Sequence, residues 1–133
     1  MKVWKPAVLL FACVILSTAL ASARAVDQPK IATVDAGIGS CKADFTVKDG
    51  AGKPIYNSKI DVFIRYGFMN LRQTTLEAYT NVDGQARFTG LPNFPKKPLE
   101  FDVLSGTVSK TITDDPTANC NAVFNVTLTV HQP

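Results

Sequence analysis

The chain has 133 residues, with 14 Lys and Arg against 11 Asp and Glu, and a net charge of +3 at pH 7. Three of the basic residues, Lys2, Lys5 and Arg24, lie in the first 25 residues, so the net charge of the remainder is about zero. A neutral chain without a clustered Lys/Arg stripe lacks the electrostatic footprint of a nucleic-acid-binding protein, and we exclude that class of partner.

The N-terminus predicts export. A positive stretch precedes the apolar run Ala7–Leu20, and the small residues that follow offer cleavage sites after Ala23 or after Ala25. The run is shorter than the roughly 20 apolar residues that a membrane span needs. We therefore expect a bacterial-type signal peptide over 1–25, no membrane span after its removal, and a secreted or periplasmic protein.

Two cysteines, Cys41 and Cys120, remain after removal of the signal. Cys41 opens the first regular strand and Cys120 opens the last, each in phase with the apolar face of its strand. An even pair in an oxidising compartment predicts a disulfide, which would close a loop of nearly the whole domain. On the loop-entropy model such a bridge contributes about 4–5 kcal/mol. The alternative is a pair of free buried thiols.

The remaining residues, about 108 in number, suffice for one small domain. Segment 26–40 lacks convincing periodicity and is interpreted as a leader, with Ile31–Val34 a candidate for an added edge strand. From Cys41 onward, short alternating runs recur every 8–12 residues without an amphipathic helix, which predicts an all-β domain over 41–131. We expect a single seven-stranded antiparallel sandwich. The expected strands are 41–48, 59–66, 74–80, 85–89, 99–103, 107–113 and 120–130.

Two residues that break the alternation predict where their strands lie. Phe63 interrupts the polar side of the 59–66 strand, which indicates a strand covered on both faces. Lys110 shares the apolar side of the 107–113 strand, which indicates an edge strand, because a lysine there opposes further pairing.

The segment Thr80–Pro92 reads Thr-Asn-Val-Asp-Gly-Gln-Ala-Arg-Phe-Thr-Gly-Leu-Pro. Asp83-Gly84 between alternating runs is a strong hairpin signal, since Gly84 can adopt the positive φ that the turn demands. Together with Gly52-Lys53-Pro54-Ile55, this segment resembles the carboxypeptidase regulatory-like domain of the transthyretin-like (prealbumin-like) β-sandwiches.

The resemblance covers about Cys41–Val103 and implies an immunoglobulin-like/prealbumin-like sandwich. In peptidases of that family the domain is an accessory to a zinc catalytic domain, and we expect this chain to be a free-standing module. It departs from the family pattern at 93–98, where extra residues follow Leu91-Pro92 and lengthen the connection.

The residues for catalysis are sparse. The one histidine, His131, lies near the C-terminus, and a triad or a histidine-ligated zinc site would have to recruit it. Related transthyretin-like hydrolases use several histidines and a C-terminal Tyr-Arg-Gly-Ser, whereas this chain ends His131-Gln132-Pro133. We therefore expect no enzyme, no cofactor and no metal site, and keep a small secreted hydrolase of that type as the alternative.

Acidic and amide side chains gather after the 107–113 strand, where Asp114, Asp115 and Asn119 could bind calcium through oxygen ligands. An ordinary Asx-rich turn ended by Pro116 explains the same residues, and we prefer that interpretation.

One connection, Tyr66–Arg72, is more apolar than a solvent-exposed loop needs to be. Either Phe68 and Leu71 fold back to cap the open end of the sandwich, or the loop contacts a partner. The second hypothesis describes an exported, non-catalytic module with a binding, structural or adhesive role at the cell envelope, where its partner would be a protein or a glycan. The candidate contact residues are Tyr66, Phe68, Met69, Leu71 and Arg72, with Phe94 as a further candidate outside this connection.

Overall fold

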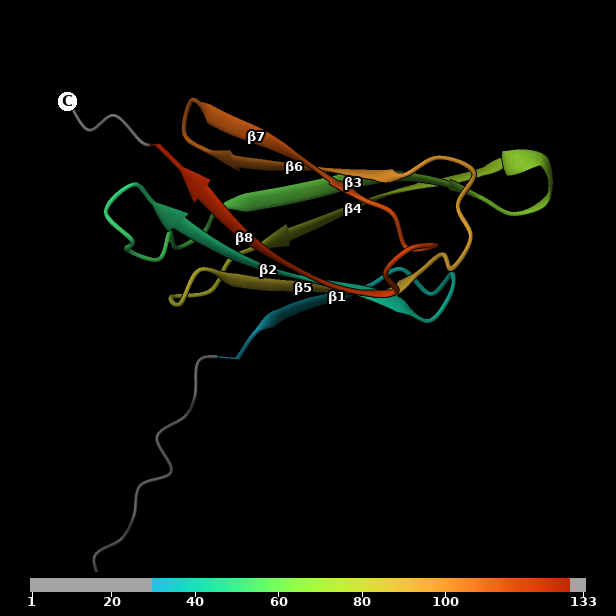
Figure 1. The fold of residues 1–133 in the computed structure, drawn as a ribbon, viewed down its shortest axis with the longest axis horizontal. Helices are drawn as coiled ribbons and strands as arrows, with labels where there is room; N and C mark the ends of the chain where they lie inside the picture. Colours follow the sequence, from blue (N-terminus) through green and yellow to red (C-terminus); the bar gives the residue numbers. More distant parts are fainter. Residues whose placement is uncertain (1–29, 130–133) are drawn as a thin grey trace, which may run out of the picture.

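The computed structural model describes residues 30–129, which form eight strands in two four-stranded sheets and one short 3-10 turn (Figure 1). The expected signal peptide and His131 lie outside the described residues. No helix in this part of the chain is long and apolar enough to cross a membrane. The elements are β1 (Ala32–Asp35), β2 (Cys41–Asp49), β3 (Lys59–Tyr66), η1 (Phe68–Asn70), β4 (Arg72–Tyr79), β5 (Gln85–Leu91), β6 (Leu99–Ser105), β7 (Val108–Asp114) and β8 (Asn121–Leu128).

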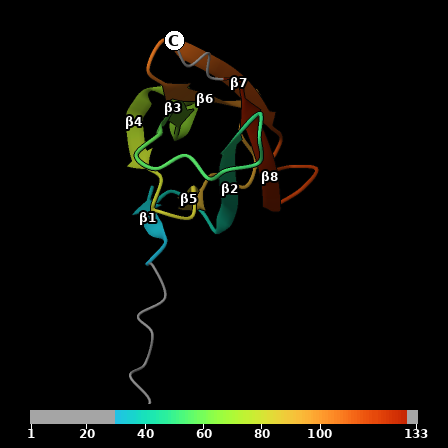
Figure 2. The same ribbon diagram turned by 90° about the vertical axis from the view of Figure 1, so that its left-hand side faces the viewer.

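The two sheets form two layers, which Figure 2 shows nearly end-on. The first has the strand order β1-β5-β2-β8 and is mixed, because β1 runs parallel to β5 and β8 parallel to β2. The second has the order β4-β3-β6-β7 and is antiparallel throughout. The all-β prediction is confirmed, whereas the predictions of seven strands and of purely antiparallel pairing are wrong. Parallel partners are joined by long connections, so no local pattern reveals them.

The added strand is β1, which lies in the segment interpreted as a leader and forms the edge of the first sheet. The candidate edge strand Ile31–Val34 is thus confirmed, displaced by one residue, although four residues are too few to show a periodic pattern. Its backbone pairs with β5 from Ala32 opposite Ala86 to Asp35 opposite Thr89.

The core lies between the sheets and is built from alternate residues of each strand. In β2, for example, Cys41, Ala43, Phe45 and Val47 are all buried, as the alternation predicted. Aromatic rings join the layers: Phe45 of the first sheet lies 4.9 Å, centroid to centroid, from Phe101 of the second. Edge-to-face and tilted ring pairs of this kind add to the stabilisation from apolar burial.

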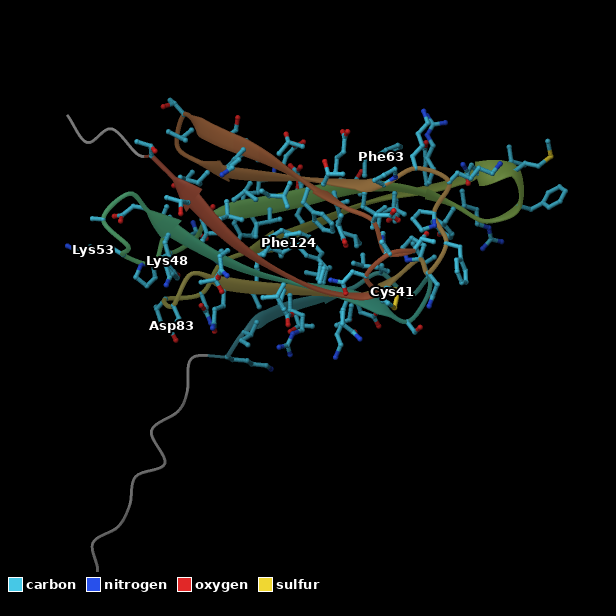
Figure 3. The ribbon with its side chains drawn as sticks, in the orientation of Figure 1. Cys41, Lys48, Lys53, Phe63, Asp83 and Phe124 are labelled. Carbon is cyan, nitrogen blue, oxygen red and sulfur yellow. A yellow bond between two sulfur atoms is a disulfide. The ribbon has the colours of Figure 1, made fainter. Side chains whose placement is uncertain are left out.

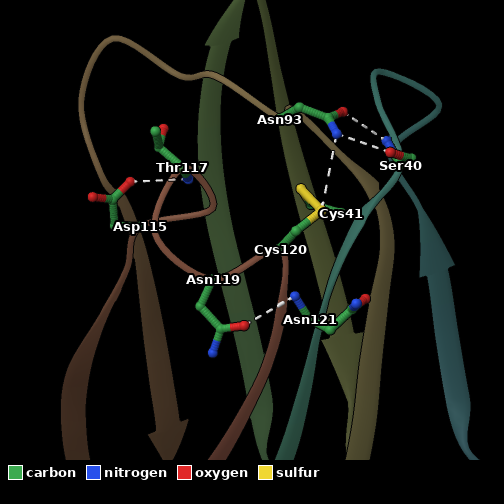
Figure 4. Close-up of a disulfide and its surroundings, with 8 residues drawn as sticks. All are labelled: Ser40, Cys41, Asn93, Asp115, Thr117, Asn119, Cys120 and Asn121. Carbon is green, nitrogen blue, oxygen red and sulfur yellow. Dashed lines mark hydrogen bonds between the residues drawn. A yellow bond between two sulfur atoms is a disulfide. The ribbon is translucent and has the colours of Figure 1, made fainter.

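The Cys41–Cys120 disulfide is present, as predicted (Figure 4). It joins residues 79 apart in the sequence and connects the start of β2 to the residue before β8. These strands are parallel neighbours in one sheet, so the bridge fixes the last strand beside the second.

The Asp83-Gly84 turn forms, with Gly84 at φ 72°. It is not a hairpin, however, because β4 pairs with β3 in one sheet and β5 pairs with β1 and β2 in the other. The turn therefore carries the chain between the layers, and the prediction of a hairpin is wrong. The local signal specifies the backbone of the turn, whereas long-range packing decides which strands pair.

The outer face of the second sheet corrects one further prediction. Phe63 is 50% exposed and points outward, so β3 is not covered on both faces in the described structure (Figure 3). The Arg65 guanidinium lies 5.6 Å from the centre of the Phe63 ring, a cation–π contact that accounts for an aromatic residue on this face. The prediction of an edge strand from Lys110 is confirmed, since β7 ends the second sheet.

Candidate functional site at the apolar tip

The candidate site lies where β3 and β4 extend beyond the rest of the second sheet. β3 pairs with β6 only over Lys59–Val62, whereas its pairing with β4 continues to Tyr66 opposite Arg72. The end of this two-stranded ribbon is closed by η1, the coiled segment at the right of Figure 1. The ribbon therefore projects its loop away from the core.

The loop between β3 and β4 has an unusual backbone conformation. Met69 and Asn70 both adopt positive φ, 54° and 55°, a conformation that is uncommon for residues other than glycine. Two hydrogen bonds close the turn, from the Asn70 N–H to the Gly67 carbonyl and from the Leu71 N–H to the Phe68 carbonyl, each 3.2 Å long. Left-handed residues held in this way cluster at functional sites.

The predicted contact residues are brought together at this loop. Phe68 is 83% exposed, Leu71 78% and Met69 68%. Arg72 is also exposed, while Tyr66 is partly buried against the core. Phe68 and Leu71 therefore do not fold back to cap the core, which was the alternative interpretation.

A second loop lies beside the first. Segment 92–98 carries Phe94, which is 84% exposed, and an indentation of about 240 Å³ separates the two loops, between Tyr66 and Gly67 on one side and Pro95 on the other. We call the four exposed side chains Phe68, Met69, Leu71 and Phe94 the apolar tip.

Segment 92–98 is fixed by hydrogen bonds near the disulfide. The Asn93 side-chain amide donates to the Ser40 hydroxyl over 2.8 Å, and the Ser40 N–H donates back to Asn93 Oδ1 over 2.9 Å (Figure 4). Asn93 Nδ2 also lies 3.9 Å from Cys120 Sγ. Segment 92–98, which the sequence showed only as an insertion, is thus attached through Asn93 to the end of the first sheet that carries the disulfide.

Positive charge flanks the apolar tip. Arg65, Arg72, Lys96 and Lys97 lie on the two loops and the ends of their strands, and segments 65–72 and 92–98 contain no Asp or Glu. None of these four side chains forms an ion pair within residues 30–129.

The acidic residues of the same sheet lie farther along its strands. Glu77 and Asp61 face each other across β4 and β3, and Lys59 binds both, at 3.2 Å and 3.6 Å. The hydrogen bond to Glu77 and its negative charge raise the pKa of Lys59. A groove of about 1090 Å³ runs from the tip along this outer face, from Leu71 and Lys96 past Phe63 towards the acidic side chains.

The acidic turn after β7 behaves as a structural turn. Asp115 Oδ1 accepts the Thr117 N–H over 3.1 Å, and Asn119 Oδ1 accepts the Asn121 N–H over 3.2 Å (Figure 4). Asp114 is only 3% exposed; burial, and secondarily the charge of Asp115, raise the pKa of its carboxyl to about 6. Among residues 30–129 no three His, Cys, Asp or Glu side chains cluster as metal ligands would.

Comparison with known proteins gives no match to a family model and none to a curated protein. Solved structures do match. Catechol 1,2-dioxygenase from Pseudomonas arvilla C-1 is 11% identical, with a TM-score of 0.50, over 80% of this chain and 60% of that one. The dioxygenase domain of a dioxygenase–carbohydrate-binding protein fusion from Streptomyces sp. SirexAA-E is 13% identical over 78% of this chain and 92% of that one, with a TM-score of 0.49.

These neighbours correct the expected function. The expectation of a non-catalytic module, and of a chain that is not an enzyme, rested on the fold and on sparse catalytic residues, yet a solved structure that shares this fold is an enzyme, the catechol 1,2-dioxygenase from Pseudomonas arvilla C-1. The architecture is therefore one that an enzyme uses, and the fold no longer supports a non-catalytic assignment. At this identity the likeness is one of fold alone, and the chain spans about 60% of the Pseudomonas enzyme.

Proposed function

We propose that this chain is an exported domain that attaches to a component of the cell envelope through its apolar tip. The observation that carries the proposal is the exposure of the four large apolar side chains Phe68, Met69, Leu71 and Phe94 at one end of the molecule. Gathered exposure of this kind is unfavourable in water and marks an interaction site. Attachment through the tip is compatible with catalysis elsewhere on the chain.

The support beneath the tip is rigid, which favours recognition. The β3–β4 ribbon is paired in unbroken register from Lys59 opposite Tyr79 to Tyr66 opposite Arg72. On the other loop, Asn93 is hydrogen-bonded to Ser40 next to the disulfide. A surface that is already ordered loses little conformational entropy when it binds.

Export is supported by two features of the chain. The disulfide between Cys41 and Cys120 requires an oxidising compartment to form and persist. The N-terminal sequence, with its positive start, apolar run and small residues, has the pattern of a signal peptide. We infer that the mature protein works in the periplasm or outside the cell.

We also propose that the two sheets form an immunoglobulin-like/prealbumin-like sandwich of the carboxypeptidase regulatory-like family. The motifs Gly52–Ile55 and Thr80–Pro92 support this assignment, as does the positive φ of Gly84 in the second motif. An experimental structure that superposes better on a carboxypeptidase regulatory-like domain than on a catechol dioxygenase is the expected result. The opposite ranking would contradict the assignment.

The attachment site is tested with a double variant, Phe68→Ser with Met69→Ser. The matched control is Tyr56→Ser with Val82→Ser, which removes two exposed apolar side chains from the opposite end. The proteins are incubated with an envelope fraction of the source cells, and the bound share is measured after sedimentation. We expect the tip variant to lose binding and the control to keep it.

Stability is measured alongside, to show that the tip variant is folded. Because both side chains are exposed, the free energy of unfolding should change by no more than about 0.5 kcal/mol. Undiminished binding of a folded tip variant would contradict the proposed attachment site.

A further inference from the structure

We propose that the envelope component contacted by the apolar tip is an anionic lipid surface, into which Phe68, Met69, Leu71 and Phe94 insert. The inference rests on the proposed function and specifies its partner. It comes from the combination of protruding apolar side chains with flanking cations that lack carboxylate partners.

The shape of the site suits a lipid surface. The apolar side chains stand on the two loops at one end of the molecule and are more than two-thirds exposed, rather than lining a pocket. Peripheral proteins bind lipid by burying such side chains about 5–10 Å deep, at the boundary between headgroups and acyl chains. The paired β3–β4 ribbon would carry the loop to that depth without rearrangement.

The charge of the site specifies an anionic surface. Arg65, Arg72, Lys96 and Lys97 flank the tip, and none is neutralised by an ion pair within the described residues. Long basic side chains keep their charged ends at the headgroup level while their apolar stems extend along the hydrocarbon boundary. Each basic residue near an anionic membrane increases binding by about fivefold.

The distribution of opposite charge gives the orientation. Asp61, Glu77, Glu100 and Asp102 lie on the outer face of the second sheet, along the strands rather than on the tip loops. With the tip in the surface, those carboxylates would be held away from the anionic headgroups.

A protein partner is the less favoured occupant. A stable protein–protein interface engages about 20–30 residues on each side. The apolar tip offers four side chains on two narrow loops, and the groove behind it carries both signs of charge. A lipid surface needs no complementary shape, so a small projecting tip suffices.

The test uses the mature chain and vesicles of two compositions, phosphatidylcholine alone and phosphatidylcholine with about one-third phosphatidylglycerol. Binding is measured by flotation at low and at physiological salt. We expect binding to the anionic vesicles, weakened by salt, and little binding to the neutral ones. Phe68→Ser with Met69→Ser should lower the partition coefficient on anionic vesicles by at least about tenfold.

Two further variants separate charge from apolar contact. Lys96→Gln with Lys97→Gln should lower binding to anionic vesicles by about 25-fold without affecting the small binding to neutral ones. Tyr56→Ser with Val82→Ser should bind as the wild type does. Equal binding of the wild type and the tip variant to anionic vesicles, or no binding of the wild type, would overturn the inference.

Failure of this inference is distinguishable from failure of the proposed function. If the wild type sediments with envelope through Phe68 and Met69 but does not float with anionic vesicles, the tip contacts a protein or a glycan and the lipid inference is wrong. If neither assay depends on the tip, both proposals are wrong.

Discussion

The turns at one end of the molecule and the 67–71 loop at the other are closed in different ways. At the end that carries Lys53 and Asp83 in Figure 3, polar side chains hold the turns. Asp49 Oδ1 accepts the N–H groups of Ala51 and Lys53, and Asn81 Oδ1 accepts those of Asp83 and Gln85. We call this the turn end.

At the other end, two backbone hydrogen bonds close the 67–71 loop of the apolar tip, which exposes Phe68, Met69 and Leu71. Two residues other than glycine adopt positive φ there, Met69 and Asn70. At the turn end Asn57 also adopts positive φ, but asparagine tolerates that conformation, whereas methionine, as at Met69, rarely adopts it. The contrast teaches that the polar side chains of the turn end stabilise their own turns, while the exposed side chains of the tip loop are available for the proposed contact with another surface.

The largest expected effect comes from removing the disulfide. Cys41→Ser with Cys120→Ser should lower the free energy of unfolding by about 4 kcal/mol, because the unfolded chain is no longer constrained by a loop of 79 residues. Denaturant melts measure the loss. Wild-type protein treated with a reductant serves as the control and should reach the same midpoint; an unchanged midpoint in both would contradict a stabilising bridge at the tip end.

The turn end should be sensitive at Gly84. A side chain there would meet the Val47 carbonyl and adopt a φ of 72°, so Gly84→Val should cost about 2 kcal/mol or more in a denaturant melt. Gly106→Val is the matched control, because Gly106 has a φ of 60° but a side chain added there would begin in open space. Equal costs at the two positions would mean that only the backbone conformation matters, and that the contact with Val47 does not.

A smaller, pH-dependent effect is expected at Asp114. Its folded carboxyl has a pKa of about 6 against an ordinary value of 3.8, so the folded state binds the proton more tightly than the unfolded state. Stability from this group is therefore fully present below about pH 4 and is lost as the pH rises to about 6.

Replacing Asp114 by Asn should raise the free energy of unfolding at pH 7 by about 1–2 kcal/mol and leave it nearly unchanged at pH 4. Melts at both pH values measure the difference. Asp115→Asn, whose side chain can still accept the Thr117 N–H, is the control and should change stability less. A gain of equal size at both pH values would show that ionisation of Asp114 is not its cause.

Much of the fold could be predicted from the sequence, because burial on one face imposes a period of two. The buried residues of β2 and of β6 (Leu99, Phe101 and Val103) follow their alternation, and the two cysteines in phase with it form a disulfide. The partition of strands between sheets could not be predicted, since β4 and β5 flank a turn that looks like a hairpin yet joins two layers. The prediction that β3 is covered on both faces was also wrong. It rested on Phe63, whose cation–π contact with Arg65 allows an aromatic residue to face outward.

The candidate site was predicted only in part. The apolar composition of Tyr66–Arg72 marked the loop, but composition does not reveal whether Phe68 is exposed or buried. Phe94 was a further candidate, whereas Lys96 and Lys97 were not predicted; all three lie more than 20 positions along the chain, in a proline-rich segment without periodicity. Their place beside the tip follows from the Asn93 hydrogen bonds to Ser40, a long-range contact with no signal in the local sequence.

The central claim is that the molecule meets the cell envelope with its apolar tip. Hydroxyl-radical footprinting of the unmodified protein, with and without an envelope fraction, tests it most directly, because Met69 and Phe68 at the tip and Tyr56 at the turn end all react when exposed. Oxidation of Met69 and Phe68 should fall on addition of envelope while oxidation of Tyr56 stays the same. Protection of Tyr56 with undiminished oxidation of Met69 and Phe68 would contradict the account.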